Sequence, residues 1–397
     1  MKIVGIIAEY NPFQNGHEYH IKKALEVTGA DAAIVVMSGD FVQRGTPAIM
    51  PKHLRADMAL HGGASIIIEI PVPYATGSAE YFAYGAVSLL DKLGCVDALC
   101  FGSECGNLQA LKQLAAILVD EPSEYKVLLS SYLKQGNSFP LARQYAIRDY
   151  LHSESIDQII SEPNNILGIE YLKALYKLNS KIEPHTIQRI SSHYHDQELQ
   201  ESFSSASAIR NSIKEFKLDE LQNQLSETSY QILKNSYKKH YPIYPNDFSL
   251  LLKYKLMNES KDTLLSYADV SEELANRIQN RLCEYQNFEQ FCNLLKTKEL
   301  TYARISRALL HIILDIKTES YQDISYARIL GFNKANTDIL TIMKKHSSIP
   351  LVTKISTCDS NELQLDVKAS DLYNSVITDK YQTEFQSEHT KQLILFR

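Results

Sequence analysis

Short apolar runs alternate with longer stretches of mixed polarity over the first 120 residues. The apolar runs occupy residues 2–8, 31–37, 65–70 and 96–101. Continuous apolar runs of this length are typical of strands that are buried on both faces of a parallel sheet. The mixed stretches predict helices at residues 17–28, 51–62, 78–93 and 106–119. This alternation predicts an α/β fold with a Rossmann-like, doubly wound parallel sheet covered by helices on both faces.

The pattern is less regular after this region. Residues 121–160 predict irregular helices, which are either an insertion into the fold or a cover over its site. Residues 183–190 predict one more parallel strand, and from about residue 217 the pattern predicts mainly helices. After Pro350, the segments 351–356 and 362–367 predict a short strand-rich tail.

The length of the chain bears on its domains. At 397 residues, the chain exceeds the size at which a single hydrophobic core usually stops growing. We therefore expect a catalytic domain at residues 1–216 and a mainly helical C-terminal domain at residues 217–397. Because ligands bind doubly wound sheets beyond the carboxyl ends of the strands, we expect the active site in the loops that follow the strands of the first domain.

The loop after the first predicted strand has the composition of a phosphate-binding segment. The strand leads into Ala8-Glu9-Tyr10-Asn11-Pro12-Phe13-Gln14-Asn15-Gly16-His17, and a helix is expected to begin at the end of this loop. Glycine permits close backbone approach, and a helix N-terminus offers free N–H groups and a positive dipole end to phosphate. His17 adds a donor that can carry a charge. This arrangement suits an ATP triphosphate, and it differs from both the GxGxxG and the GxxxxGK[ST] motifs.

Two later segments also place polar groups where helices are expected to begin. Asn164 and Asn165 precede an apolar helix. Asn is a good helix cap, and two adjacent amides also suit the edge of an adenine or a ribose. Small hydroxyl residues begin another helix at Ser204-Ser205-Ala206-Ser207-Ala208-Ile209-Arg210. These hydroxyls, the free N–H groups and the arginine together predict a second anion site.

Composition argues against several classes of protein. Hydrophobic residues make up 44% of the chain, and no apolar run approaches the roughly 20 residues that cross a bilayer. The N-terminus lacks a signal-peptide pattern, so we expect a cytoplasmic protein without a membrane partner. The six cysteines include no CxxC pair, so we expect reduced thiols and no metal site.

Basic residues gather in one part of a chain whose formal net charge is −6. Residues 296–354 hold ten Lys or Arg against five acidic residues, with Tyr302 and Tyr326 among them. Basic groups interleaved with aromatic ones can bind a nucleic-acid backbone and stack on exposed bases. A solvated helix face explains the same charges, and charge alone favours that explanation.

The first loop and the Ser-rich segment together resemble the HxGH nucleotidylyltransferase superfamily. The first motif of this superfamily is usually His/Thr-x-Gly-His, and Gln14-Asn15-Gly16-His17 takes its place here. The late motif, Ile-Ser-Ser-Thr-x-Ile-Arg, is matched by residues 205–210, with Ala and Ser where Ser and Thr are usual. The resemblance implies the nucleotidylyltransferase type of Rossmann-like sheet.

A closer resemblance, to the bacterial tRNA(Met) cytidine acetate ligases, covers most of the chain. It rests on five ordered segments, residues 8–20, 38–45, 101–104, 163–171 and 188–190. It extends through Tyr-Ala-Arg at 302–304 and through residues 326–332.

The closer resemblance implies a reaction in two steps. Ligases of this family use ATP to activate acetate as acetyl-adenylate, and pyrophosphate is released. The acetyl group then passes to N4 of the wobble cytidine of elongator tRNA(Met), which gives N4-acetylcytidine. The resemblance therefore implies ATP with Mg²⁺, acetate and elongator tRNA(Met) as substrates and partners, and no DNA partner.

The resemblance also assigns a nucleotide site to residues of the loops. The implied ATP-binding residues are Ile7, Ala8, Glu9, Tyr10, Asn11, Pro12, Phe13, Gln14, Asn15, Gly16, His17, His20, Gly102, Asn164, Asn165, Arg189, Ile190, Ser205, Ser207 and Arg210. Gly102 is expected to let the backbone approach the nucleotide, Arg189 to contact phosphate or stack, and Ile190 to pack on the adenine. The Ser-rich segment is expected to hold the β- and γ-phosphates.

His17 is the expected catalytic donor, which stabilises charge at the α-phosphate as pyrophosphate leaves. Lys22 or Arg44 is expected to assist the attack of the cytidine amine. Gln14 replaces the first His of the motif, and it can donate a hydrogen bond to phosphate but cannot carry a charge. Glu104 is expected either to cap the helix that starts near Gly106 or to face the ligand.

The basic C-terminal section is the expected contact with tRNA. The expected tRNA-binding residues are Arg304, Arg307, Arg328, Lys344 and Lys345. Two other functions stay open: an adenylyltransferase for a small phosphate-bearing metabolite, and a non-catalytic, ATP-sensing protein that binds RNA. The length of the helical section argues against the former, and Gln14 keeps the latter open.

Overall fold

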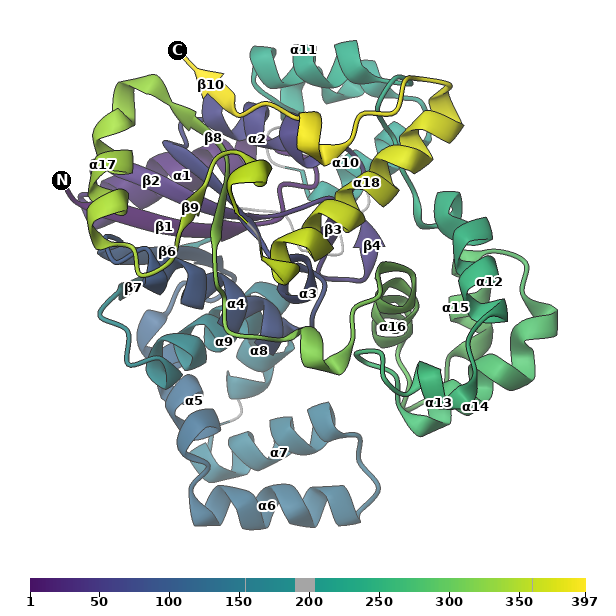
Figure 1. Cartoon of the computed structure of the whole chain (residues 1–397). Helices are drawn as coiled ribbons and strands as arrows, with labels where there is room; N and C mark the ends of the chain where they lie inside the picture. The colour runs from purple at the N-terminus through teal and green to yellow at the C-terminus, as the bar shows by residue number, and fades with distance from the viewer. Residues whose placement is uncertain (154, 190–203, 359) are drawn as a thin grey trace.

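The structure is a computed structural model that describes residues 1–153, 155–189, 204–358 and 360–397. At its centre is an eight-stranded sheet in the order β10–β8–β5–β2–β1–β6–β7, with β9 beside β8 (Figure 1). The parallel strands are β1 Ile3–Ala8, β2 Ala32–Ser38, β5 Ile66–Ile70, β6 Ala98–Ser103 and β7 Glu183–Gln188. All five lie where the sequence predicts strands, and the predicted Rossmann-like fold is confirmed.

Helices cover both faces of this sheet because successive side chains of each strand point to opposite sides. In β1, Ile3 and Ile7 join the core on one face, whereas Val4 and Ile6 join the core on the other. The first core is covered by α4 Ala79–Lys92, α5 Leu108–Asp120, α9 Pro163–Lys177 and α17 Thr337–His346. The second core is covered by α1 Asn15–Thr28, α2 Lys52–His61, α10 Ala206–Lys214 and α11 Glu227–Ser236.

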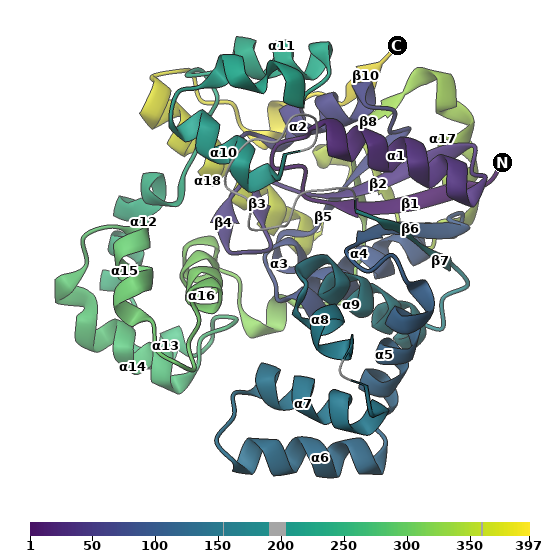
Figure 2. The ribbon, with the colours of Figure 1, turned by 180° about the vertical axis from the view of Figure 1, so that it is seen from behind.

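Residues 121–160 are helical, as the sequence predicts. Their helices are α6 Ser123–Lys134, α7 Phe139–Leu151 and α8 Ser155–Ser161. The first two pair as a hairpin that extends away from the sheet (Figures 1 and 2). The hydroxyl of Tyr132 donates a hydrogen bond to Asp149 across this hairpin.

A helical module with its own apolar core occupies residues 249–314. Its helices are α12 Ser249–Met257, α13 Lys261–Leu264, α14 Glu272–Arg281, α15 Phe288–Leu295 and α16 Tyr302–Leu314. The module lies beside the short hairpin of β3 Phe41–Val42 and β4 Thr46–Pro47 and the short helix α3 Val72–Ala75 (Figure 2).

After the module, the chain returns to the central sheet. β8 Ala327–Asn333 pairs antiparallel with β5, and β9 Leu351–Val352 and β10 Ile394–Phe396 pair in parallel with β8. Within residues 217–397, the module is a helical unit with its own core, whereas the three late strands extend the central sheet and α11 and α17 pack against it.

The predicted strand at residues 362–367 is wrong, because this segment lies in α18 Asn361–Tyr381. Leu363 and Val367 are both buried and four residues apart, which is the spacing of one helix face. The short window also fitted an alternating pattern, so it did not distinguish a helix from a strand. In the described part of the chain, no helix is long and apolar enough to span a membrane.

Candidate functional site

Gln14 organises the start of α1 and links it to a distant segment. Its side-chain Oε1 accepts a hydrogen bond from the backbone N–H of Gly16 at 2.6 Å. Its backbone N–H donates to Nδ1 of His17 at 3.2 Å. Its Nε2 donates to the carbonyl of Ser204 at 3.1 Å. The side chain is only 7% exposed, so both ends of its amide are used within the protein. Gln14 therefore holds the loop in place, whereas the sequence suggested a hydrogen bond to phosphate.

His17 is a neutral hydrogen-bond donor in this setting. Because its Nδ1 accepts from the Gln14 amide, the ring proton lies on Nε2. Burial, together with the positive charge of Arg189 and the nearby His20 ring, lowers the pKa of His17 to about 3. The Tyr10 ring lies against it, with 4.8 Å between the ring centroids. The sequence suggested a charged His17, but at neutral pH its N–H donates without carrying a charge.

Arg189 lies near His17 and His20 of α1, close enough for its charge to act on both imidazoles. It lowers the pKa of His17, and with burial it also lowers that of His20, to about 4. Gly102 lies next to this side chain, since a Cβ added to it would be in ordinary van der Waals contact with Cγ of Arg189 at 3.4 Å. The Nε2 of His20 is buried and has no hydrogen-bond partner among the residues that the structure describes. Ile190 lies outside the described residues.

The late Ser-rich motif meets the first loop. Ser205 caps α10, since its hydroxyl accepts from the Ala208 amide at 3.0 Å. Arg210 donates to the carbonyl of Asn11 at 2.8 Å and to the hydroxyl of Ser207 at 2.9 Å. The N-termini of α1 and α10 are therefore joined through residues 11–14, and both present positive dipole ends near this loop. The two segments that the sequence paired are brought together.

Much of the loop after β1 is buried and keeps its shape from within. Tyr10, Asn11, Pro12 and Phe13 are buried, and Ile7 and Ala8 belong to β1. Asn15 begins α1, and its Nδ2 donates to the carbonyl of Asn223 at 2.9 Å. The polar groups available to a nucleotide therefore come mainly from the far end of the loop, around His17.

Asn164 and Asn165 make contacts that stabilise the start of α9. Glu104 accepts from the amide and the Nδ2 of Asn164, at 3.2 and 2.5 Å, and from the amide of Asn165 at 2.8 Å. The Oδ1 of Asn165 accepts from the amide of Cys105 at 3.2 Å. Glu104 therefore caps α9, and these contacts account for the Asn pair without a nucleotide.

Lys22 and Arg44 lie at the rim of the site. Lys22 is exposed on α1, and Arg44 is exposed at the turn between β3 and β4. Gly45 follows with a φ of 74°, a left-handed conformation that glycine adopts without strain. The neighbouring Gln43 amide donates to Oε1 of Glu9 at 3.0 Å, so this turn is tied to the first loop.

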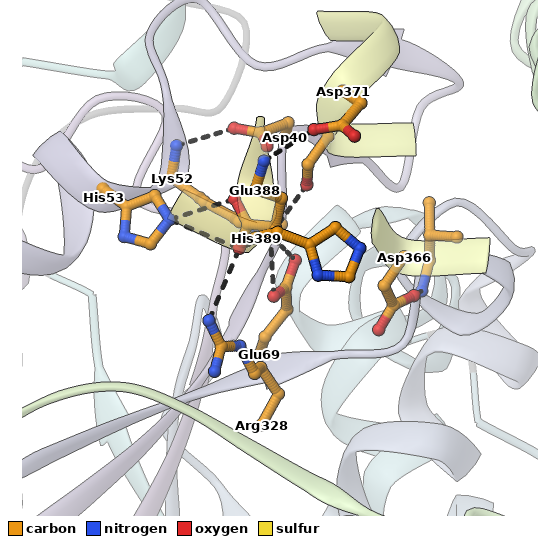
Figure 3. A network of polar contacts seen from close by, with 12 residues as sticks. Asp40, Lys52, His53, Glu69, Arg328, Asp366, Asp371, Glu388 and His389 are labelled. Carbon is orange, nitrogen blue, oxygen red and sulfur yellow. Dashed lines mark hydrogen bonds and ion pairs between the residues drawn. The ribbon is translucent and has the colours of Figure 1, made fainter. Parts of the chain in front are cut away.

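A buried charge network that sequence analysis missed lies beside the second loop, residues 39–51 (Figure 3). Lys52 is 1% exposed, and its ammonium contacts Oε1 of Glu69 at 2.8 Å, the hydroxyl of Ser370 at 2.7 Å and Oε1 of Glu388 at 3.0 Å. The Lys52 amide donates to Oδ1 of Asp40 at 2.7 Å, which fixes the start of α2. The C-terminal segment that carries Glu388 therefore packs against the end of the loop that carries Arg44.

The groups of this network shift one another's protonation. Burial raises the pKa of Glu69 to about 8, against the opposing effect of Lys52. Burial also acts to raise the pKa of Glu388, but Lys52 and His53 hold it well below its usual range. The one sequence signal for the network was Glu69, a lone carboxylate inside the otherwise apolar β5.

The five expected tRNA-binding residues do not share one surface. Arg328 is 3% exposed in β8 and lies 3.7 Å from Glu388, so it cannot reach a surface-bound RNA. Arg307 donates to Asp269 at 2.8 Å and, like Arg304, lies on α16. The burial of Arg328 corrects the expectation from the sequence, which could not show that Tyr-Ala-Arg at 326–328 enters the sheet.

Lys344 and Lys345 are exposed in the last turn of α17, at the edge of the sheet opposite to α16. The Ser348 amide donates to the carbonyl of Lys92 at 2.9 Å, just before β6 begins. This end of α17 is therefore next to the amino-terminal ends of the parallel strands. In contrast, α16 contacts the turn at Gly45, beyond the carboxyl end of β2.

Comparison with known proteins gives consistent results. The model of the HIGH Nucleotidyl Transferase family matches residues 1–389. A tRNA(Met) cytidine acetate ligase of Clostridium acetobutylicum is 44% identical over 390 residues, which cover 95% of this chain and 96% of the relative. A tRNA(Met) cytidine acetate ligase of Thermoanaerobacter sp. strain X514 is 43% identical over 382 residues, or 94% and 95% of the two chains.

Solved structures agree with these relatives. A crystal structure of apo Thermotoga maritima TmcAL superimposes with a TM-score of 0.93 at 33% identity and covers 100% of both chains. A second crystal structure of that protein, bound with alpha-thio ATP, has a TM-score of 0.91 at 32% identity, again over 100% of both chains.

Proposed function

Because the chain belongs to the HIGH nucleotidyl transferase family and, within it, to the tRNA(Met) cytidine acetate ligases, we propose that it acetylates tRNA. The proposed reaction activates acetate with ATP and transfers the acetyl group to N4 of the wobble cytidine of elongator tRNA(Met). The observation that carries the proposal is the meeting of α1 and α10 at the loop after β1. Membership of a ligase family favours this reaction over a small-metabolite adenylyltransferase and over a non-catalytic ATP sensor.

In the first step, a carboxylate oxygen of acetate attacks the α-phosphorus of ATP, and pyrophosphate leaves. Negative charge increases on the phosphoryl oxygens, so the site needs fixed donors and no protein nucleophile. His17 is proposed to donate its Nε2 proton as a hydrogen bond to the α-phosphate. Arg189, exposed beside His17, is proposed to supply the positive charge that the neutral imidazole lacks.

In the second step, the cytidine N4 attacks the acetyl carbon, AMP leaves, and N4 loses a proton. The cytosine must leave the base stack to reach the adenylate. Lys22 and Arg44 lie at the rim and are proposed to position the tRNA or the acyl group there. The Ser205–Ser207–Arg210 group is proposed to fix the loop that holds the β- and γ-phosphates, because its hydroxyls and guanidinium already bind within the protein.

Mg²⁺ is proposed to enter with the triphosphate. Among the described residues, no group of three or more His, Cys, Asp and Glu is arranged to hold a metal ion. Asp40 and Glu9 accept hydrogen bonds from Lys52 and Gln43 amides, so their oxygens are already partly used. Mg²⁺ commonly keeps several waters and binds mainly to substrate phosphates, which suits such a site.

The tRNA is proposed to approach the carboxyl edge of the sheet, with Arg304 and Arg307 on α16 near its path. Arg328 is left out of this surface because it is buried. Since the proposed substrate is a tRNA, we also propose that the protein acts in the cytoplasm.

The test is a reconstituted reaction with purified protein, ATP, Mg²⁺, acetate and unmodified elongator tRNA(Met). We expect N4-acetylcytidine in the digested RNA by mass spectrometry, and its loss when either ATP or acetate is omitted. His17→Ala is expected to abolish the product, whereas the exposed His346→Ala serves as a matched control with full activity. Absence of acetylcytidine with the wild-type protein refutes the proposed function.

A further inference from the structure

Arg55 of α2 binds four backbone carbonyls from a fully buried position. It is 0% exposed. Its Nε donates to the carbonyl of Met50 at 3.1 Å, and its Nη1 donates to the carbonyls of Ser38 at 3.1 Å and Glu9 at 2.5 Å. Its Nη2 donates to the carbonyl of Gly39. One guanidinium therefore joins segments that are far apart in the sequence.

These carbonyls lie where two neighbouring strands end. Glu9 follows β1, and Ser38 and Gly39 stand at the end of β2. Where the chains leave the sheet, their carbonyls lose their ladder partners, and a buried carbonyl without a donor is costly. Arginine suits this position because its planar guanidinium has five N–H donors in a fixed fork, whereas a lysine ammonium offers three from one point.

Two further hydrogen bonds join the first loop, residues 9–14, to the second loop, residues 39–51. Oε1 of Glu9 accepts from the Gln43 amide at 3.0 Å, and Oδ1 of Asn11 accepts from the Ile49 amide at 2.7 Å. With Arg55, they fix the relative position of the loop that leads to His17 and the loop that carries Arg44. The carboxylates of Asp40 and Glu9 favour the charged guanidinium, although burial lowers the pKa of Arg55.

We propose that Arg55 is a positioning residue for ATP binding and adenylation, which sets the first and second loops at the separation that the nucleotide requires. This inference rests on the proposed use of ATP and deepens it. Arg55 touches neither substrate nor reacting atoms, because it is fully buried and its donors bind carbonyls. Its effect reaches the nucleotide only through the two loops.

The test compares Arg55→Lys with Arg277→Lys. Arg277 also donates to backbone carbonyls, those of Leu295 at 3.0 Å and Leu294 at 3.4 Å, but it lies in the helical module. Each variant loses arginine–carbonyl hydrogen bonds while keeping its positive charge. ATP affinity is measured by calorimetry with Mg²⁺, without acetate or tRNA, at a temperature where circular dichroism shows both variants folded.

We expect Arg55→Lys to raise the Kd for ATP by about tenfold or more, since small misplacements of binding groups are costly. Arg277→Lys is expected to leave this Kd within about twofold of wild type. An unchanged Kd in folded Arg55→Lys, or an equal rise in Arg277→Lys, overturns the proposal. Because neither acetate nor tRNA is present, a wild-type protein that binds ATP but makes no acetylcytidine refutes only the proposed function.

Hydrogen exchange of the wild-type protein tests the same inference if Arg55→Lys does not fold. The Gln43 and Ile49 amides donate across the two loops. If Arg55 joins the loops into one unit, both amides exchange through a common opening with the same free energy. Independent opening of the two amides overturns the proposal.

Discussion

Gln14 uses both ends of its side-chain amide inside the protein, with the Gly16 amide and the Ser204 carbonyl as partners. We predict that Gln14→Ala destabilises the protein by about 1 kcal/mol, as the loss of a helix cap does. It should also weaken ATP binding several-fold, because the segment before α10 loses its hydrogen bond to Gln14 and only the contact of Arg210 with Asn11 still joins α10 to the first loop. Asn287→Ala is the matched control, since Asn287 caps α15 through the Gln290 amide at 2.9 Å.

Urea unfolding and ATP calorimetry on the two cap variants separate these effects. Both should lose similar stability, and only Gln14→Ala should lose ATP affinity. If Gln14→Ala binds ATP as well as wild type does, the hydrogen bond between Gln14 and Ser204 has no part in nucleotide binding.

His17 and His20 make stability depend on pH at the acidic side. Their pKa values are lowered to about 3 and about 4 in the folded protein, against about 6.5 for an unfolded histidine. Below about pH 6.5, the unfolded chain therefore binds protons that the folded chain does not, and the free energy of unfolding falls as the pH falls towards 4. We predict a shallower fall in His17→Gln than in wild type between pH 6.5 and 4.

Urea unfolding at a series of pH values measures this slope. The exposed His346→Gln is measured beside His17→Gln as the matched histidine substitution. If His17→Gln also keeps the wild-type slope, His17 is not held neutral by the fold.

Single residues of the site were predictable where the chemistry is local. The loop that ends in Gly16 and His17 predicted the start of a helix, and in the structure α1 begins at Asn15. Arg55 was missed because its partners are backbone carbonyls of other loops. Every residue has such a carbonyl, so no residue type in the sequence identifies these partners. The role of Glu104 was left open because the helix that it caps, α9, begins about 60 residues later, as its separation from Asn164 indicates.

The second loop is stabilised by contacts between elements that are far apart in the chain. Glu388 contacts Lys52 at 3.0 Å, His53 at 3.2 Å and Arg328 at 3.7 Å, and it is 2% exposed. We predict that Glu388→Gln destabilises the protein by about 3 kcal/mol, because removal of one partner leaves buried charges uncompensated. Glu384→Gln, an exposed change in the same segment, should cost less than about 0.5 kcal/mol.

Denaturant unfolding at pH 7 tests the pair of variants. A loss in Glu388→Gln no larger than in Glu384→Gln would mean that the C-terminal segment contributes little to this network. The contact between His53 and Glu388 spans 335 residues, so no local pattern predicts it.

The strands of the sheet also differ in whether they could be predicted from the local sequence or depend on a distant partner strand. Four of the five parallel strands were predictable because each is a continuous apolar run, whereas β7 is mostly polar and only partly buried. β8 was not, since it lies in a stretch that follows helices and pairs with β5, about 260 residues earlier, as the pairing of Ile67 with Gly331 shows. A segment such as β8 takes its conformation from the partner strand as well as from its own pattern.

At the scale of the whole molecule, the basic residues of the C-terminal half divide between two edges of the sheet. Arg304 lies on α16, whose Ser306 hydroxyl donates to the Gly45 carbonyl at 2.8 Å beside Arg44. Lys344 and Lys345 lie near the amino-terminal ends of the strands. A tRNA that delivers its cytidine to the loop after β1 must approach the carboxyl edge. Figure 2 shows α16 beside β3 and β4, whereas α17 lies on the other side of the sheet, near the N-terminus.

We therefore predict that Arg304→Ala weakens tRNA binding and lowers the slope of log K against log salt by about 1, the value for one lost phosphate contact. Lys344→Ala with Lys345→Ala removes two exposed charges at the other edge and should leave both affinity and slope unchanged. Filter binding of tRNA at several salt concentrations measures both quantities. If the double variant loses slope and Arg304→Ala does not, the tRNA lies across α17, and the anticodon must reach the site around the edge of the sheet.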